Sequence, residues 1–320
     1  MRVLHVDTAT ELRGGQRQLV LLVEGLRARG VEQLVACPPD APLRGLLPDL
    51  ELVDVRPGNH PANLMRLRAA SAAVDVVAAH TSHAHFAGLA ADAPLVVHRR
   101  VDFPPHDGWL SRRKYLVPAA FVCVSGAVAA VLSDAGVPPD RLHVVHDGVR
   151  ALPPLPPAEL GEGPIVLAVG ALVDHKDHAT LAAAAAAVEA RVLVAGEGPR
   201  RPDLEATELE LLGHRDDVAA LFARAQVFVH CSQEEGMGQV VVEAMLAGLP
   251  VVATRAGGVP EVVGEAGLLV PVRDPAALAD ALNRALKGEH PAADVSKAQA
   301  RRFGVDAMVE GTLQAYRAVL

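Results

Sequence analysis

The chain has 320 residues, of which 51% are hydrophobic and 21% charged, a composition typical of a folded two-domain protein rather than of a disordered or disulfide-scaffolded one. Its 38 Asp and Glu residues against 30 Lys and Arg residues give a net charge of −8, which argues against nucleic acid as the main partner. Aromatic residues make up only 3% of the chain, so few rings are present to stack on bases.

The sequence also indicates a compartment. Its apolar stretches are shorter than the roughly 18 residues of a membrane span, and Asp7 interrupts the first of them, where a secretory signal would continue. The cysteines, Cys37, Cys123 and Cys231, are far apart and lie in or beside Val-rich runs, as buried and reduced cysteines do. We therefore expect a cytoplasmic protein.

Short runs rich in Val, Leu and Ala alternate with helical patterns along the first half of the chain. The runs are continuous in apolar residues, which is typical of parallel strands covered on both faces. A helix is expected over 16–29, with an apolar stripe at Leu19, Val23 and Leu26. The expected strands are residues 2–7, 33–37, 51–55, 74–79, 94–98, 121–124 and 142–145.

Residues 151–164 are rich in Pro and Gly and are predicted to form a stiff linker, because such a segment continues neither helix nor central strand. The alternation then resumes, with a helix over the alanine run at 181–190 and a last helix over about 306–320. The expected strands of this half are residues 165–169, 191–195, 208–212, 227–230, 251–254 and 268–270.

This rhythm predicts an α/β protein with two Rossmann-like, doubly wound parallel-sheet domains that face a ligand-binding cleft. We expect an N-terminal domain at 1–150, a C-terminal domain at 165–300, and a terminal helix at about 301–320 that packs back on the first domain.

Two adjacent glycines, Gly14 and Gly15, precede the first expected helix. They allow a ligand to approach the backbone, and the helix N-terminus offers unpaired N–H groups to an anion, although a plain turn is an alternative. The surrounding sequence lacks a Gly-x-Gly-x-x-Gly fingerprint with its acidic ribose partner, which disfavours a dehydrogenase.

The strongest motif follows the expected strand at 227–230. A glycine-bearing loop holds Glu235, and a helix that begins near Gln239 places Glu243 about one turn further along. Carboxylates accept hydrogen bonds from the hydroxyls of sugars and ribose, and amides at Gly238 and Gln239 would face a phosphate. The alternative is a capping acid followed by a solvated glutamate.

This segment resembles the signature of the retaining, family 4 glycosyltransferases ("glycosyl transferases group 1"), which have the GT-B fold. The resemblance covers nearly the whole chain and is tightest between residues 165 and 272. Further landmarks of that family are found in order at residues 14–15, 124–125, 145–149, 169–177, 194–199, 212–218 and 256–261.

The resemblance implies transfer of a sugar, with retention at its anomeric carbon, from a nucleotide-diphosphate sugar to a glycan, lipid-linked or small-molecule acceptor. It implies no divalent metal and no other cofactor, because Lys176 and helix N-termini would neutralise the departing diphosphate. Lys176, Glu235 and His98 are the implied catalytic residues, and Glu243 would bind the ribose. The other residues that the resemblance places at the sugar donor are Gly14, Gly15, His214, Arg215, Met237, Gly238, Gln239 and Val240.

The chain departs from this family at Ala171, where an arginine that binds phosphate is common. Another cation would then assist Lys176, with Arg13, Arg17 and Arg99 as candidates. The N-terminal domain is also short for the family, so elements that shape the acceptor site are expected to be trimmed.

The histidines allow two interpretations. His98 lies where the family often has a histidine near the reacting sugar, or it makes only a structural hydrogen bond at a strand end. His80, His83 and His85 could suggest a metal, but they cannot share one helical face, so we expect no metal and place His80 at the acceptor.

Residues 99–116 combine aromatic rings, such as Phe103, Trp109 and Tyr115, with several arginines. This combination suits an anionic or lipid-linked acceptor, or a peripheral contact with the inner face of the cell membrane; a packed helix with a solvated basic flank is the alternative. A sugar-nucleotide epimerase or phosphorylase of the same fold, or a non-catalytic binding protein, are the other functions considered. The sequence indicates neither the nucleotide, sugar and acceptor nor an oligomeric state.

Overall fold

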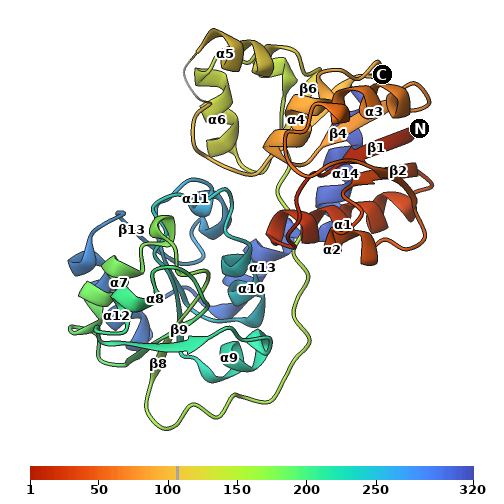
Figure 1. Cartoon of the computed structure of the whole chain (residues 1–320). Helices are drawn as coiled ribbons and strands as arrows, with labels where there is room; N and C mark the ends of the chain where they lie inside the picture. Colours follow the sequence, from red (N-terminus) through yellow and green to blue (C-terminus); the bar gives the residue numbers. More distant parts are fainter. Residues whose placement is uncertain (106–107) are drawn as a thin grey trace. The chain divides into compact units, whose positions relative to one another are not determined.

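The computed structural model describes residues 1–105 and 108–320, without the side chains of residues 109–112. The chain divides into two compact units (Figure 1). Unit 1 comprises Met1–Gly148 and Val305–Leu320, and unit 2 comprises Val149–Gly304. Each unit is a parallel sheet with helices, so the predicted α/β class with two Rossmann-like domains is confirmed.

Unit 1 is built on a seven-stranded parallel sheet with the order β3-β2-β1-β4-β5-β6-β7. The winding direction reverses between β1 and β4, where Val3 of β1 pairs with Val76 of β4. At such a reversal the loops after the two strands diverge and leave room for a ligand at their carboxyl ends. The strands are β1 (Arg2–Val6), β2 (Glu32–Cys37), β3 (Glu51–Asp54), β4 (Val76–Ala79), β5 (Leu95–Arg99), β6 (Ala120–Cys123) and β7 (Leu142–Val144).

The helices of unit 1 cover this sheet. They are α1 (Gly14–Arg27), α2 (Pro42–Gly45), α3 (Ala62–Ser71), α4 (Ser82–Gly88), α5 (Trp109–Leu116), α6 (Gly126–Asp134), the 3-10 turn η1 (Pro139–Arg141) and α14 (Val305–Arg317). The predicted stripe of α1, at Leu19, Val23 and Leu26, is buried. None of the helices in the described part of the chain combines the length and the apolar character that crossing a bilayer requires.

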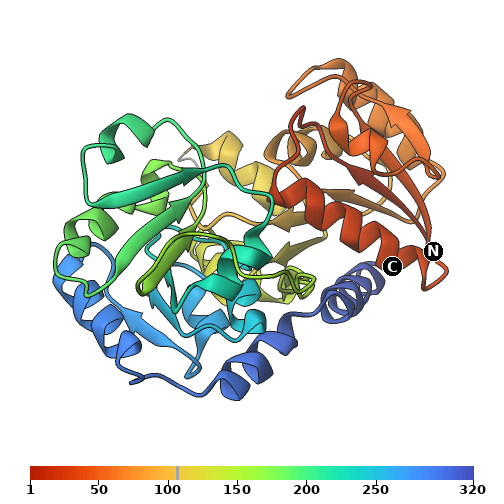
Figure 2. The same ribbon diagram turned by 90° about the horizontal axis from the view of Figure 1, so that it is seen from below.

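The last helix, α14, belongs to unit 1 although it follows unit 2 in the chain. It lies beside α1, as Figure 2 shows for the last and first helices. Gly25 of α1 permits this approach, because a Cβ atom there would lie 2.3 Å from the Cγ2 atom of Val309. The face of α14 that is buried in the core of unit 1 carries Met308, Val309, Thr312, Leu313, Ala315 and Tyr316.

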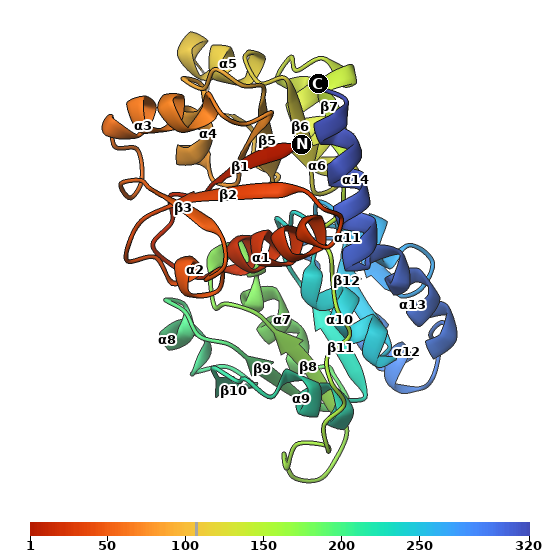
Figure 3. The ribbon, with the colours of Figure 1, turned by 90° about the vertical axis from the view of Figure 1, so that its right-hand side faces the viewer.

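Unit 2 is built on a six-stranded parallel sheet with the order β10-β9-β8-β11-β12-β13. Its winding reverses between β8 and β11, which Figure 3 shows as neighbours near the centre of the unit. The strands are β8 (Ile165–Val169), β9 (Arg191–Ala195), β10 (Leu209–Gly213), β11 (Val227–His230), β12 (Val251–Thr254) and β13 (Leu268–Val270). The helices are η2 (Asp174–Lys176), α7 (His178–Ala185), α8 (Arg201–Leu204), α9 (Val218–Arg224), α10 (Gln239–Ala247), α11 (Val259–Val263), α12 (Pro275–Leu286), α13 (Ala293–Ala300) and η3 (Arg301–Phe303).

The predicted helix over the alanine run is wrong in its extent. Helix α7 begins three residues earlier, at His178, where the side chain of Asp177 accepts a hydrogen bond from the Thr180 amide. It ends at Ala185, because the next amides bond in tighter i→i−3 turns, as the Val188 amide does with the Ala185 carbonyl. High helix propensity in an alanine run therefore does not decide where the helix stops.

Residues 151–164 form neither helix nor strand. They are held on unit 2 by polar contacts: the Ala158 amide donates to the Ala220 carbonyl, and Arg224 donates to the carbonyls of Gly161 and Gly163. This proline-rich segment thus follows the surface of unit 2 over part of its length.

The close contact between α1 and α14 predicts the effect of a small substitution. Gly25→Ala places a methyl group against Val309 and should lower the free energy of unfolding by about 1–3 kcal/mol, the usual cost of overpacking a core. Gly45→Ala is the matched control, because no heavy atom lies within 4 Å of a Cβ atom at that position. Urea unfolding measures both, and equal midpoints for the two variants would contradict the packing.

Candidate active site

The loops that follow β8 and β11 carry a network of polar side chains at the reversal of unit 2. Lys176, at the end of η2, forms an ion pair with Oε2 of Glu235. Nε2 of His230 lies 3.0 Å from the same oxygen and 3.0 Å from Oγ of Ser232. The side chains of Lys176, Glu235 and His230 are 21%, 15% and 4% exposed. Lys176 and Glu235 are therefore partly accessible to solvent, whereas His230 is buried.

Backbone contacts hold the two loops in place. The Gln233 amide donates to the His175 carbonyl at 2.8 Å, and the thiol of Cys231 donates to the Lys176 carbonyl at 3.2 Å. On the other side, the Gly258 amide donates to the Glu235 carbonyl at 2.9 Å. The lysine and the glutamate are therefore positioned by main-chain bonds as well as by their own ion pair.

Glu235 is held as a carboxylate. Burial alone would raise its pKa, but the hydrogen bond from His230 and the positive charge of Lys176 outweigh burial and keep the pKa of Glu235 well below its usual range. Burial lowers the pKa of His230, so that residue is neutral and donates its Nε2 proton to Glu235. The site thus offers one fixed negative charge and one ammonium group.

His230 is a residue of this network that was not predicted from the sequence. It is the last residue of strand β11, directly before the loop that carries Glu235. A histidine at the carboxyl end of the strand that leads into the glutamate loop is a signal that could have identified it, because parallel strands present their last residues to the ligand-binding edge.

Helix α10 begins at Gln239, as predicted. Gly238 precedes it with a φ angle of +92°, a backbone conformation that glycine adopts readily, and Met237 is buried beneath the loop. Val240 lies in the first turn, so tertiary packing overrides the strand preference of the valine run.

Glu243 lies one turn into α10 and lines a cavity of about 280 Å³. The other walls of this cavity come from α9, through Ala219 and Phe222, and from residues 151–155 of the proline-rich segment. The structure therefore brings Lys176 and Glu235 into direct contact, whereas Glu243 lines a separate cavity.

The loop after β10 carries the other predicted residues of unit 2. His214 Nε2 lies 3.1 Å from Asp216, and Arg215 makes a two-pronged ion pair with Asp217 at 2.7 and 2.6 Å. Gly213, with φ at +73°, allows the chain to turn there. The side chain of Arg215 is thus engaged within its own loop.

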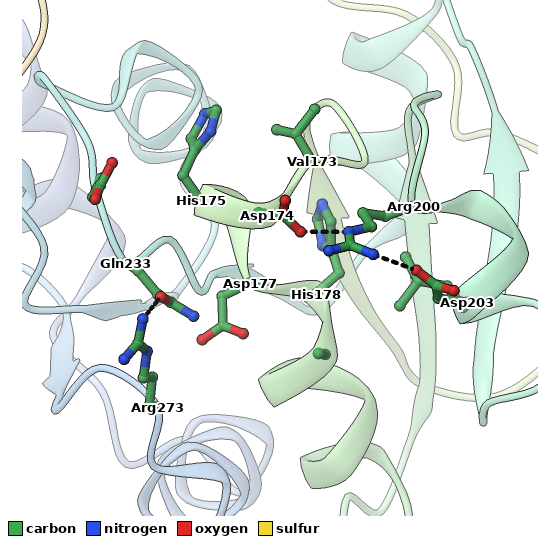
Figure 4. A pocket seen from close by; sticks show the side chains of 12 residues that line it. Val173, Asp174, His175, Asp177, His178, Arg200, Asp203, Gln233 and Arg273 are labelled. Atoms are coloured by element: carbon green, nitrogen blue, oxygen red, sulfur yellow. Dashed lines mark hydrogen bonds and ion pairs between the residues drawn. The ribbon is translucent and has the colours of Figure 1, made fainter.

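A larger cavity, of about 760 Å³, adjoins the network (Figure 4). Its walls include His175 and Asp177, which flank Lys176, and Gln233, which is hydrogen bonded to Arg273. Figure 4 shows Arg200 joined to both Asp174 and Asp203 on the opposite wall.

In unit 1, Gly14 and Gly15 begin α1 after the loop from β1. A Cβ atom at position 15 would meet no heavy atom within 4 Å, so the backbone there is open to approach. Arg17, one of the candidate second cations, is exposed in the first turn.

Of the predicted histidines of unit 1, His80 and His98 are buried in one cluster, whereas His83 is exposed. His80 and His98 stack with ring centroids 4.3 Å apart, Nδ1 of His5 lies 3.0 Å from Nε2 of His80, and Nε2 of His98 lies 2.8 Å from the hydroxyl of Tyr316. His85 contacts the Lys114 carbonyl instead. Within residues 1–105 and 108–320, no group of three or more His, Cys, Asp or Glu side chains is arranged to hold a metal ion.

Arg99 is also buried, and its guanidinium group donates to the Tyr115 hydroxyl and to the carbonyls of Val101 and Phe103. Among the residues of the 99–116 segment, Phe103 is half exposed. The predicted segment also includes Trp109, whose side chain lies outside the described residues.

Both halves of the chain match family models. Residues 12–151 match "Glycosyltransferase Family 4", and residues 163–288 match "Glycosyl transferases group 1". The chain belongs to the family 4, group 1 glycosyltransferases. The predicted resemblance is confirmed, and so is the GT-B fold: HepE from Anabaena, solved in complex with UDP, superposes with a TM-score of 0.82 at 21% identity over 99% of this chain and 100% of that one, a likeness that shows the fold alone.

Curated relatives include glycosyltransferases of several kinds. The chain is 36% identical over 113 residues to N-acetyl-alpha-D-glucosaminyl L-malate synthase from Bacillus anthracis, a match that covers 32% of this chain and only 29% of that enzyme. It is 27% identical over 309 residues to the lipopolysaccharide core biosynthesis glycosyltransferase LpsE from Rhizobium meliloti, covering 89% of this chain and 88% of LpsE.

The buried histidines of this family 4 protein predict that its stability depends on pH. Burial lowers the pKa of His5 to about 4 from its ordinary value of 6.5. Because the unfolded chain binds a proton between these values and the folded chain does not, stability is full above about pH 6.5 and falls as the pH drops toward 4, by up to about 1.4 kcal/mol per pH unit. Urea unfolding at several pH values measures this slope.

His5→Gln should make that slope shallower by the share of one histidine, whereas His214→Gln, at an exposed position, should leave it unchanged. A slope that is the same in both variants would show that His5 is not buried in its neutral form.

Proposed function

We propose that the chain transfers a sugar from a nucleoside-diphosphate sugar to an acceptor hydroxyl, with retention at the anomeric carbon and without a divalent metal. The observation that carries this proposal is the network of Lys176, Glu235 and His230 at the reversal of the unit 2 sheet. Two structures of one solved neighbour support a nucleotide-sugar donor, because HepE from Anabaena was solved with UDP and with UDP-glucose.

Lys176 would bind the diphosphate. In the structure its ammonium group is already held at the mouth of the network by Glu235, so it is oriented before a ligand arrives. A diphosphate carries more negative charge than one carboxylate and would attract the ammonium group away from part of this ion pair. Charge that develops on the departing diphosphate would then be neutralised without reorganisation of the loops.

Glu235 would bind hydroxyls of the transferred sugar. Oε2 already accepts from Lys176 and His230, which stabilises the carboxylate and makes it weakly basic. A weakly basic carboxylate is a poor nucleophile, so we favour attack of the acceptor on the same face from which the diphosphate leaves over a covalent glycosyl-enzyme. The proton of the acceptor hydroxyl would then pass to the departing phosphate oxygen.

Glu243 would bind the ribose hydroxyls. Its position at the cavity formed with α9 and residues 151–155 supports this role, because the cavity is apolar apart from the glutamate and so suits the face of a nucleoside. The backbone of 213–215 would border the base. Arg17, which is exposed at the start of α1, is our candidate for the second cation in place of an arginine at Ala171.

The acceptor would belong to cell-envelope biosynthesis. The match to LpsE over 89% of the chain supports a glycan or lipid-linked acceptor, and exposed apolar side chains at Phe103, Leu116 and Val117 support a peripheral contact with the cytoplasmic face of a membrane.

A direct test combines UDP-, GDP- and ADP-glucose with candidate acceptors and follows the products by NMR. We expect a glycoside whose anomeric configuration equals that of the sugar donor. An inverted product would refute retention, an epimerised donor would indicate an epimerase, and nucleotide binding without any turnover would indicate a binding protein.

Removal of the ammonium group should slow the reaction. Lys176→Ala should lower kcat by about 10²-fold or more, since charge on the leaving diphosphate is no longer neutralised. Lys287→Ala, at an exposed position on unit 2, is the control and should retain kcat. Normal turnover in Lys176→Ala would refute the phosphate assignment.

Glu243→Ala should instead raise the KM for the nucleotide sugar with a smaller effect on kcat, because the ribose contact is made before and during the reaction.

Activity should survive an excess of EDTA. Complete loss of activity in chelator, restored by a divalent metal, would refute metal independence.

A further inference from the structure

A second polar cavity lies in unit 1, at the carboxyl ends of β4 and β5. Its volume is about 190 Å³. Among the residues that the structure describes, its walls contain two arginines, Arg99 and Arg100, and no carboxylate. His80 and Phe103 are among the other lining residues.

Hydrogen bonds fix the tautomer of His80. Gln33 donates its amide N–H to the Val23 carbonyl at 3.0 Å, so its Oε1 accepts from Nε2–H of His5. Nδ1 of His5 therefore carries a lone pair and accepts from Nε2–H of His80 at 3.0 Å. Burial and the nearby His98, His5 and Arg100 lower the pKa of His80, which keeps the ring neutral. Its Nδ1 atom is thus an unprotonated hydrogen-bond acceptor.

This acceptor has no partner. His80 is 92% buried, and its Nδ1 atom makes no hydrogen bond within the described part of the chain. A buried polar atom without a partner is costly unless a ligand or water satisfies it. Because His80 lines the cavity, a hydroxyl group of a bound molecule is the natural partner.

Arg100, which also lines the cavity, carries a buried donor without a partner. Arg100 uses Nε to pair with Asp147 at 2.9 Å, while its Nη1 atom is buried with no hydrogen-bond partner among the described residues. Asp147 does not line the cavity, so its charge fixes the arginine from behind. The free side of a guanidinium group matches the oxygens of a phosphate or carboxylate.

We propose that this cavity binds the acceptor, and that the acceptor is a hydroxylated anion whose hydroxyl group donates to His80 and whose anionic group is held by Arg100. This inference rests on the proposed function and specifies the class of acceptor. A phosphate monoester fits both groups, either as a soluble sugar phosphate or as the head of a lipid. Phe103 is half exposed at the cavity and can yield to an entering ligand.

Isothermal titration calorimetry on the full chain, without a nucleotide sugar, tests whether the bound molecule must carry an anionic group. sn-Glycerol 3-phosphate, myo-inositol 1-phosphate and glucose 6-phosphate are compared with glycerol, inositol and glucose. At least one phosphate should bind about tenfold or more tightly than its neutral partner, as expected for a charged hydrogen bond. Absence of a preference in all three pairs would overturn the proposal.

Two variants test whether the preference for phosphates over neutral molecules arises in this cavity. Arg100→Gln with Asp147→Asn removes the guanidinium without leaving a buried carboxylate alone, and it should abolish the preference. Arg56→Gln, at an exposed position after edge strand β3, is the matched control and should keep it. A preference that survives in the double variant would overturn the role of Arg100.

A hydroxyl-free probe tests His80. Propyl phosphate should bind more weakly than sn-glycerol 3-phosphate, and His80→Gln, which keeps an N–H donor toward His5, should remove that difference. An unchanged difference would overturn the role of His80. Vesicles of phosphatidic acid distinguish a lipid source: capture of the chain that sn-glycerol 3-phosphate competes away indicates a lipid head, and soluble binding alone indicates a free phosphate.

These results separate this inference from the proposed function. A preference for phosphates that depends on Arg100, without any turnover of nucleotide sugars, would support anion binding in the cavity and refute the transferase activity. Turnover of neutral acceptors only, with no preference for phosphates, would support the transferase activity and refute the binding of an anionic acceptor in the cavity.

Discussion

A single carboxylate, ionised in a position that is 15% exposed, is the constraint on which the site of unit 2 depends. Glu235 can stay charged there only because Lys176 neutralises it and His230 donates to it. The same two contacts orient the lysine and connect the loops after β8 and β11. A ligand that carries both negative charge and hydroxyl groups can replace these contacts in kind, which is why a sugar diphosphate suits the site better than an apolar or cationic molecule.

The fold was largely predictable because the apolar runs of its strands and the apolar stripes of its helices are both clear in the sequence. Continuous apolar runs bounded by Gly and Pro identified the strands, and the strand at 165–169 agrees with β8 residue for residue. The end of α7 was not predictable, since alanines favour helix on both sides of Ala185 and the turn after it is set by packing. The motif around Glu235 and Lys176 was recognisable from residue type and order, and the direct contact between them follows from the adjacency of β8 and β11.

Other parts of the site could not be read from the sequence. His230 belongs to an apolar strand, where a histidine is equally consistent with a structural bond, so only the distance to Glu235 reveals its role. The pairing of Arg215 with Asp217 depends on the local turn at Gly213. The tautomer of His80 depends on Gln33, which lies 47 positions away in the chain and meets the histidines only because β1, β2 and β4 are neighbours.

The most direct measurement is a crystal structure of the chain with the nucleoside diphosphate that stabilises it most against heat. The account predicts a phosphate oxygen within hydrogen-bond distance of the Lys176 ammonium group and the ribose hydroxyls on Glu243. A nucleotide bound elsewhere, with the pair of Lys176 and Glu235 untouched, would contradict it.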